Sequence, residues 1–131
     1  MTVANNILPG NERKIQIMLV DDERDVLDLL KLTLISEGFE VRTCWNGENL
    51  NTLIGENKPD IVLLDIKMKD VDGTEICQMI KNNPATHDIK IILFSANDNL
   101  ELIEKKCGAD GSLAKPYNKK IARQMFQKVL R

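Results

Sequence analysis

The sequence predicts an α/β protein built on a doubly wound, five-stranded parallel sheet with helices on both of its faces. Short apolar runs of four to six residues alternate with segments in which apolar residues recur at helical spacing. This alternation favours parallel strands joined by right-handed helical crossovers. The run at residues 89–94 is almost entirely apolar, as expected of a strand that is covered on both sides.

Strands and helices are expected to alternate along a single domain of residues 14–131. The strands are expected at residues 15–20, 40–44, 60–64, 89–94 and 110–114. The helices are expected at residues 23–37, 48–55, 72–82 and 98–107, and from residue 118 to the end. Residues 1–13 are polar, contain Pro9-Gly10 and show no periodicity, so they are expected to form a flexible tail.

Capping residues mark the ends of these helices. Gly38 and Gly108 follow the first and fourth helices, where glycine commonly ends a helix. Asp72, with Glu75 three residues later, resembles a capping box at the start of the third helix. Asn118 is expected to cap the last helix. The apolar residues expected on buried helix faces are Val26, Leu29, Leu30 and Leu34 in the first helix and Ile121, Met125 and Val129 in the last.

Charged side chains follow three of the predicted strands directly. Asp21 and Asp22 come after the first strand, Asp65 after the third and Lys115 after the fifth. Because the carboxyl ends of parallel strands lie at one edge of a sheet, these groups are expected to meet there. A cluster of acids facing one lysine suits a divalent cation and a phosphoryl group.

The strand-end residues form an ordered pattern over residues 15–130. In chain order they are Asp21-Asp22, Asp65, Ser95 and Lys115-Pro116. In residue type and position this pattern resembles the receiver domain of two-component response regulators. The resemblance implies a flavodoxin-like fold with sheet order 2-1-3-4-5. It also implies a cis peptide bond between Lys115 and Pro116.

The resemblance implies a phosphoacceptor and a metal site. Asp65 is then the phospho-acceptor, which receives a phosphoryl group from a phosphohistidine on a sensor histidine kinase or a histidine phosphotransfer protein. Asp22, Asp65 and the backbone carbonyl of Lys67 are implied to ligate Mg²⁺, with Asp21 acting through water. Magnesium suits this role because it binds one or two carboxylates and accepts phosphate oxygens.

The same resemblance gives roles to two further residues. Ser95 is expected to hydrogen-bond the phosphoryl oxygens, and Lys115 to form an ion pair with them. The protein does little covalent work in phosphoryl transfer, because positioning and charge neutralisation provide most of the catalysis. The chain is therefore expected to be a signalling domain that catalyses only its own phosphorylation and dephosphorylation, and not an enzyme acting on other substrates.

Three positions depart from the usual receiver. The loop after Asp65 commonly carries Met-Pro, but here Lys69 follows Met68, so the loop is expected to keep its shape and to be less rigid. Lys67 is hypothesised to pair with the phosphoryl group or to obstruct attacking water. Ser112 stands where receivers often have a Tyr or Phe that moves on activation, and Tyr117 is expected to pack and not to switch.

Composition narrows the partners and the location. The net charge of -2 argues against a generally basic nucleic-acid binder. The resemblance implies an output surface formed by helix four, strand five and helix five. Residues 105–131, which build this surface, carry eight basic residues against one acid, so the surface is expected to be basic and to bind an acidic downstream protein. Neither a membrane-length apolar stretch nor a signal peptide is found, so no membrane contact and a cytoplasmic location are expected.

Two alternative functions remain open. A phosphatase of the haloacid dehalogenase type also uses a strand-end Asp, but it has a second acid two residues later, where this chain has Lys67. A degenerate receiver that acts only as an interaction module is kept open by Ser112. Nucleotide binding is not supported, because neither G-x-G-x-x-G nor a Walker A sequence occurs. Cys44, Cys77 and Cys107 are expected to be small buried apolar side chains.

Overall fold

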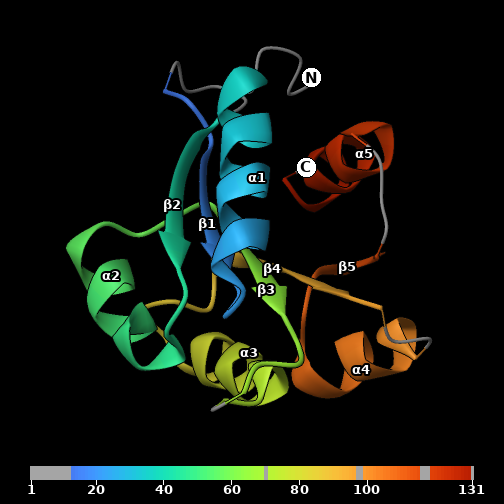
Figure 1. Ribbon diagram of the computed structural model, residues 1–131. Helices are drawn as coiled ribbons and strands as arrows, with labels where there is room; N and C mark the ends of the chain where they lie inside the picture. The colour runs from blue at the N-terminus through green and yellow to red at the C-terminus, as the bar shows by residue number, and fades with distance from the viewer. Residues whose placement is uncertain (1–12, 70, 97–98, 116–118, 131) are drawn as a thin grey trace.

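The computed structural model describes residues 13–69, 71–96, 99–115 and 119–130 (Figure 1). Its strands are β1 (Gln16–Val20), β2 (Glu40–Cys44), β3 (Ile61–Asp65), β4 (Lys90–Ser95) and β5 (Gly111–Ala114). Its helices are α1 (Arg24–Ser36), the short 3₁₀ turn η1 (Gly47–Asn49), α2 (Leu50–Glu56), α3 (Gly73–Asn82), α4 (Leu100–Cys107) and α5 (Lys119–Val129). The expected alternation of strands and helices is confirmed.

The strands form one parallel sheet in the order β2-β1-β3-β4-β5. The chain leaves β1 toward β2 on one side and returns to β3 on the other, so the strand order reverses at β1. The register pairs Val20 with Leu64, and Asp65 with Phe94. The carboxyl ends of the central strands are therefore level with one another at the position where open α/β sheets bind ligands.

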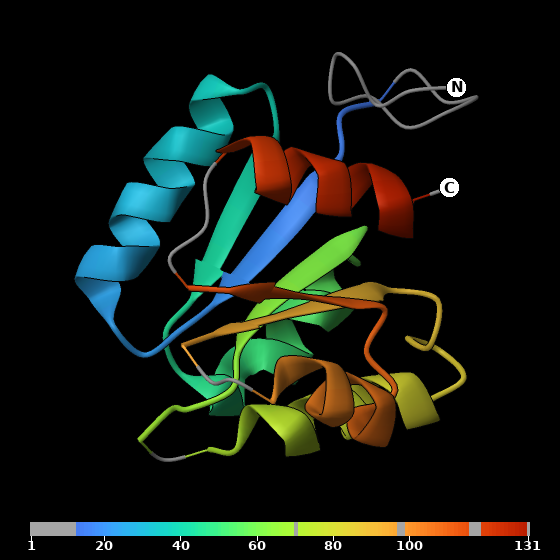
Figure 2. The same ribbon diagram turned by 90° about the vertical axis from the view of Figure 1, so that its right-hand side faces the viewer.

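Two hydrophobic cores cover the two faces of the sheet. Helices α1 and α5 lie on one face, and α2, α3 and α4 lie on the other (Figure 2). Alternate residues of a strand supply the two cores, so Leu19 and Leu63 pack with α1 and α5, while Val20 and Leu64 pack on the opposite face. Strands β1 and β3 have every side chain from Ile17 to Val20 and from Ile61 to Asp65 buried, which explains their apolar sequences.

The predicted buried faces of the first and last helices were partly wrong. Leu29 is 68% exposed, and Leu27 instead packs into the core with Leu34. In α5, Ile121 is 47% exposed, and the smaller Ala122 lies buried with Phe126 and Val129. The pattern favoured the larger apolar side chains, but a small alanine lets the helix approach the sheet more closely. Periodicity therefore located these helices without fixing their rotation.

The helix boundaries agree with most of the predicted caps. Asp72 caps α3, and its carboxylate accepts hydrogen bonds from the backbone N–H and the hydroxyl of Thr74, at 2.9 and 2.7 Å. Gly108 ends α4 in the left-handed conformation with φ 82°, which glycine adopts without strain. The segment predicted as a helix at 48–55 begins instead with η1, and α2 starts at Leu50. The tail, the Pro116 peptide bond and the cap at Asn118 lie outside the described residues.

Two expectations from composition can be compared with the structure. Cys44, Cys77 and Cys107 are free thiols and all three are buried, as expected of small apolar side chains. Burial raises the pKa of the Cys77 thiol, which keeps it protonated and unreactive at neutral pH. Among the described residues, no helix is both long enough and apolar enough to span a bilayer.

Candidate metal centre at the sheet edge

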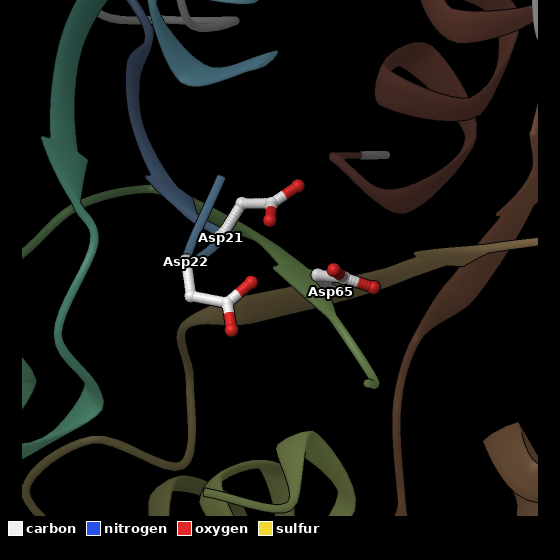
Figure 3. Close-up of side chains that lie close together, drawn as sticks. All are labelled: Asp21, Asp22 and Asp65. Carbon is white, nitrogen blue, oxygen red and sulfur yellow. The ribbon is translucent and has the colours of Figure 1, made fainter. Parts of the chain in front are cut away.

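Three carboxylates meet at the carboxyl ends of β1 and β3. Asp21 and Asp22 directly follow β1, and Asp65 is the last residue of β3, the neighbouring strand. Each offers one oxygen that lies within 4.8 Å of the others (Figure 3). The predicted convergence of these acids from two distant chain segments is confirmed.

Asp21 is the most deeply buried member of the cluster. It is 0% exposed, and one carboxylate oxygen accepts a hydrogen bond from the backbone N–H of Glu23 at 3.0 Å. Its backbone N–H donates to the carbonyl of Cys44 on β2 at 3.1 Å. The second carboxylate oxygen, Oδ2, receives no hydrogen bond within the described residues, and its nearest cation is the ammonium of Lys115 at 3.5 Å. An acidic oxygen is therefore buried without a full set of partners.

Asp22 is contacted from the loop between β3 and α3. The backbone N–H of Lys69 donates to Asp22 Oδ2 at 2.6 Å. The sequence reasoning missed this hydrogen bond, which joins residues 47 positions apart. The sequence holds one hint of this bond. Position 69 is a lysine where receivers commonly have a proline, and only a residue other than proline has a backbone N–H to donate.

Lys115 faces the acids from the end of β5. Its ammonium lies 3.5 Å from Asp21 Oδ2 and 3.9 Å from Asp65 Oδ2. The same ammonium lies 4.5 Å from the centre of the Phe94 ring, a cation–π contact on its apolar side. The backbone N–H of Lys115 donates to the carbonyl of Ser95 at 2.9 Å, so the β4–β5 pairing sets its position.

The environment of Asp65 disfavours its ionised form. Burial, and to a smaller extent repulsion from Asp21, raises the pKa of Asp65 to about 6. Lys115 acts in the opposite direction and lowers this pKa. A divalent cation would relieve both this repulsion and the incomplete bonding of Asp21. Hard oxygen donors in this number match the ligands that Mg²⁺ takes in proteins. The residues present therefore fit a magnesium ion.

The loop that follows Asp65 is folded back tightly on β3. The backbone N–H of Gly73 donates to the carbonyl of Ile66 at 2.9 Å, and Lys67 and Asp72 form an antiparallel bridge. A Cβ atom at Gly73 would collide with the backbone carbonyl of Asp65 and lie 2.8 Å from the Cα of Ile66. Glycine is required at this position because no side chain fits. Because glycine has no Cβ, the start of α3 can lie close to the site.

The remaining predicted site residues lie at different depths. Ser95 is 4% exposed at the end of β4, next to β3. Lys67 is exposed, and its backbone N–H lies 3.4 Å from Asp65 Oδ1. The Ser112 hydroxyl lies farther away on β5 and donates to Glu104 Oε2 of α4 at 3.0 Å. Tyr117 lies outside the described residues.

Part of the basic segment lies next to α1. Lys119, Lys120 and Arg123 of α5 line a hollow with Glu37 at the end of α1, and Arg123 pairs with Glu37 at 3.4 Å. These three cations of α5 therefore lie near the end of α1. The apolar periodicity did not fix the rotation of α5 about its axis, so the position of these charges could not be predicted from the sequence.

Comparisons with known proteins agree with this geometry. A family model described as the response regulator receiver domain matches residues 17–127, and the chain belongs to this family. A putative response regulator from Chloroflexus aurantiacus superposes with a TM-score of 0.84 at 26% identity, covering 90% of this chain and 98% of that one.

Two more solved structures have the same fold. A two-component response regulator from Clostridium difficile gives a TM-score of 0.79 at 28% identity, covering 90% of this chain and 97% of that one. The chemotaxis protein CheY4 of Vibrio cholerae gives 0.80 at 22% identity, covering 88% and 98%, and this similarity concerns the fold alone. The expected family and its flavodoxin-like strand order are therefore confirmed.

Proposed function

We propose that this receiver domain is an active phosphoacceptor, which takes a phosphoryl group from a phosphohistidine of a partner protein onto Asp65 in a Mg²⁺-dependent reaction. The observation that carries the proposal is the convergence of three carboxylates within 4.8 Å, with the Lys115 ammonium facing two of them. The donor is a sensor histidine kinase or a histidine phosphotransfer protein.

The acceptor chemistry follows from the position of Asp65. A carboxylate oxygen of Asp65 attacks the phosphorus, the new O–P bond forms, and the N–P bond of the donor histidine breaks with its electron pair staying on the imidazole. Asp65 must be ionised to attack, and its pKa of about 6 leaves most of it ionised at neutral pH. Asp21 remains fixed beside it as a second negative group.

Metal binding is assigned to the same cluster. Asp22, Asp65 and the backbone carbonyl of Lys67 would hold Mg²⁺, with Asp21 acting through water. When bound, the ion supplies positive charge that offsets the carboxylates and the phosphoryl oxygens. Lys115 would pair with a phosphoryl oxygen, and the hydroxyl of Ser95 would donate to another.

The output of this domain is assigned to the face formed by α4, β5 and α5. Ser112 occupies this face and is bonded to Glu104, so β5 and α4 are linked by a polar contact instead of an aromatic side chain. Leu102 and Ile121, at 54% and 47% exposed, provide apolar surface on the two flanking helices. A downstream protein would bind there, and direct binding to nucleic acid or to a membrane is not expected.

The proposal is tested by incubating the chain with Mg²⁺ and a small phosphodonor such as acetyl phosphate, and then measuring its intact mass. One added phosphoryl group is expected for the parent. None is expected after Asp65→Asn or without Mg²⁺. Asp88→Asn is the matched control, because Asp88 is an exposed acid remote from the cluster that pairs with Lys58, and this variant should be phosphorylated like the parent.

The alternatives give different outcomes in the same experiment. A degenerate receiver would gain no mass under any condition. A phosphatase of the haloacid dehalogenase type would instead turn over a phosphate ester, with continuous release of inorganic phosphate. Either result would contradict the proposed function.

A further inference from the structure

We propose that the backbone N–H of Lys69 is a positioning group for the metal ligand Asp22 and makes the β3–α3 loop part of the cation site. The inference rests on the proposed function, since it assumes that the acidic cluster binds Mg²⁺. It adds a group that does not touch the ion and acts only through Asp22.

The bond itself is short and charge-assisted. The Lys69 nitrogen lies 2.6 Å from Asp22 Oδ2, and hydrogen bonds to an ionised oxygen are stronger than those between neutral groups. Asp22 is only partly buried, so its side chain has fewer packing contacts than Asp21 to hold one orientation. Since a carboxylate has two oxygens, binding one of them to the loop leaves the other for a cation. In Figure 3 one Asp22 oxygen is directed toward the other two carboxylates.

The loop is well suited to hold Asp22 in place. Its base is closed by the hydrogen bond from Gly73 to Ile66 and by the bridge between Lys67 and Asp72. Lys69 lies beyond this closed base and reaches across to the end of β1. The same loop contains the carbonyl of Lys67, a proposed metal ligand. The hydrogen bond from Lys69 to Asp22 therefore fixes the position of the Asp22 carboxylate relative to the Lys67 carbonyl. Groups outside the ligand shell of metal sites commonly have this role.

A tryptophan lies close to the hydrogen bond between Lys69 and Asp22. Asp22, Lys69 and Trp45, which follow β1, β3 and β2, line one hollow of about 310 Å³. Trp45 is the chain's single tryptophan, and the guanidinium of Arg24 lies 3.9 Å from the centre of its ring. A change at Asp22 or Lys69 on cation binding is therefore expected to alter the fluorescence of Trp45.

Two substitutions at one position separate the backbone group from the side chain. Lys69→Pro removes the N–H and therefore the hydrogen bond to Asp22. Lys69→Ala removes the ammonium but keeps the N–H, and it is the matched control. Proline at this position is common in the receivers that the chain resembles, so the loop is expected to accept it.

The affinity for Mg²⁺ is measured without any phosphodonor, by titration of Trp45 fluorescence and by calorimetry. Lys69→Ala is expected to bind Mg²⁺ as tightly as the parent or slightly more tightly, because a positive charge has been removed. Lys69→Pro is expected to bind about tenfold more weakly, the lower end of the effect of removing an outer partner of a metal ligand. Circular dichroism and melting without Mg²⁺ check that both variants are folded.

Two results would overturn the inference alone. The first is equal Mg²⁺ affinity of folded Lys69→Pro and Lys69→Ala. The second, which applies even if the proline variant does not fold, is a Lys69 amide that exchanges freely with solvent in the parent and is unchanged by Asp22→Asn. A parent chain that binds no Mg²⁺ at all would instead overturn the proposed function, and this inference with it.

Discussion

Asp65→Asn is predicted to stabilise the metal-free protein at neutral pH. Asp65 is 4% exposed, and its pKa is raised from 3.8 to about 6 by burial and by the charge of Asp21. A shift of about two units corresponds to about 3 kcal/mol of cost for keeping the group ionised in the folded state. An asparagine has nearly the same shape and carries no charge, so it removes this cost.

The pH dependence of this effect has a defined sign. Between pH 3.8 and about 6 the folded state binds more protons at Asp65 than the unfolded state does, so this residue lowers stability as the pH rises. The advantage of Asp65→Asn should therefore be about 3 kcal/mol at pH 7.5, about half of that at pH 5 and about 0.5 kcal/mol at pH 4. Effects of titrating groups that do not interact with Asp65 largely cancel in the comparison between the two proteins.

The assay is urea unfolding followed by circular dichroism, with a chelator present, at these three pH values. Asp28→Asn changes an exposed acid on α1 and should shift the free energy of unfolding by no more than about 0.5 kcal/mol. With Mg²⁺ added, the parent should gain stability by mass action and Asp65→Asn should gain much less. The reasoning is refuted if Asp65→Asn is no more stable than the parent at pH 7.5, or if its advantage is the same at pH 4.

Three further predictions follow from the geometry. Gly73→Ala should lower the free energy of unfolding by about 2 kcal/mol or more in urea titrations, because its Cβ meets the backbone of Asp65; an unchanged midpoint would contradict this. Lys115→Met should raise the pKa of Asp65 further, since Lys115 lowers it, and NMR titration of the carboxyl group would show a fall or no change if the assignment were wrong. Leu34→Ala should cost about 2–5 kcal/mol and Leu29→Ala less than about 0.5 kcal/mol, because only Leu34 is buried; equal losses in thermal melts would contradict the observed rotation of α1.

The fold and the acidic cluster could be predicted because they depend on order along the chain. Apolar runs separated by helical segments define parallel strands, and a residue that directly follows such a strand must lie at one edge of the sheet. Asp21, Asp22, Asp65 and Lys115 were located in this way without any knowledge of side-chain packing.

What could not be predicted depends on packing between distant segments. The burial of Ala122 in place of Ile121 reflects the rotation of α5 about its axis as it packs on the sheet. The same rotation places Arg123 beside Glu37 at the end of α1. The hydrogen bond from Lys69 to Asp22 requires the loop after β3 to reach the end of β1. Neither feature leaves a periodic signal in the sequence.

The most direct test of the central claim is to locate the phosphoryl group chemically. The chain is treated with Mg²⁺ and acetyl phosphate, reduced with borohydride, which converts an aspartyl phosphate to homoserine, and analysed by peptide mass spectrometry. Homoserine at position 65 alone is the predicted result. Modification at His87 or at a hydroxyl residue, or an unmodified Asp65 after complete treatment, would contradict it.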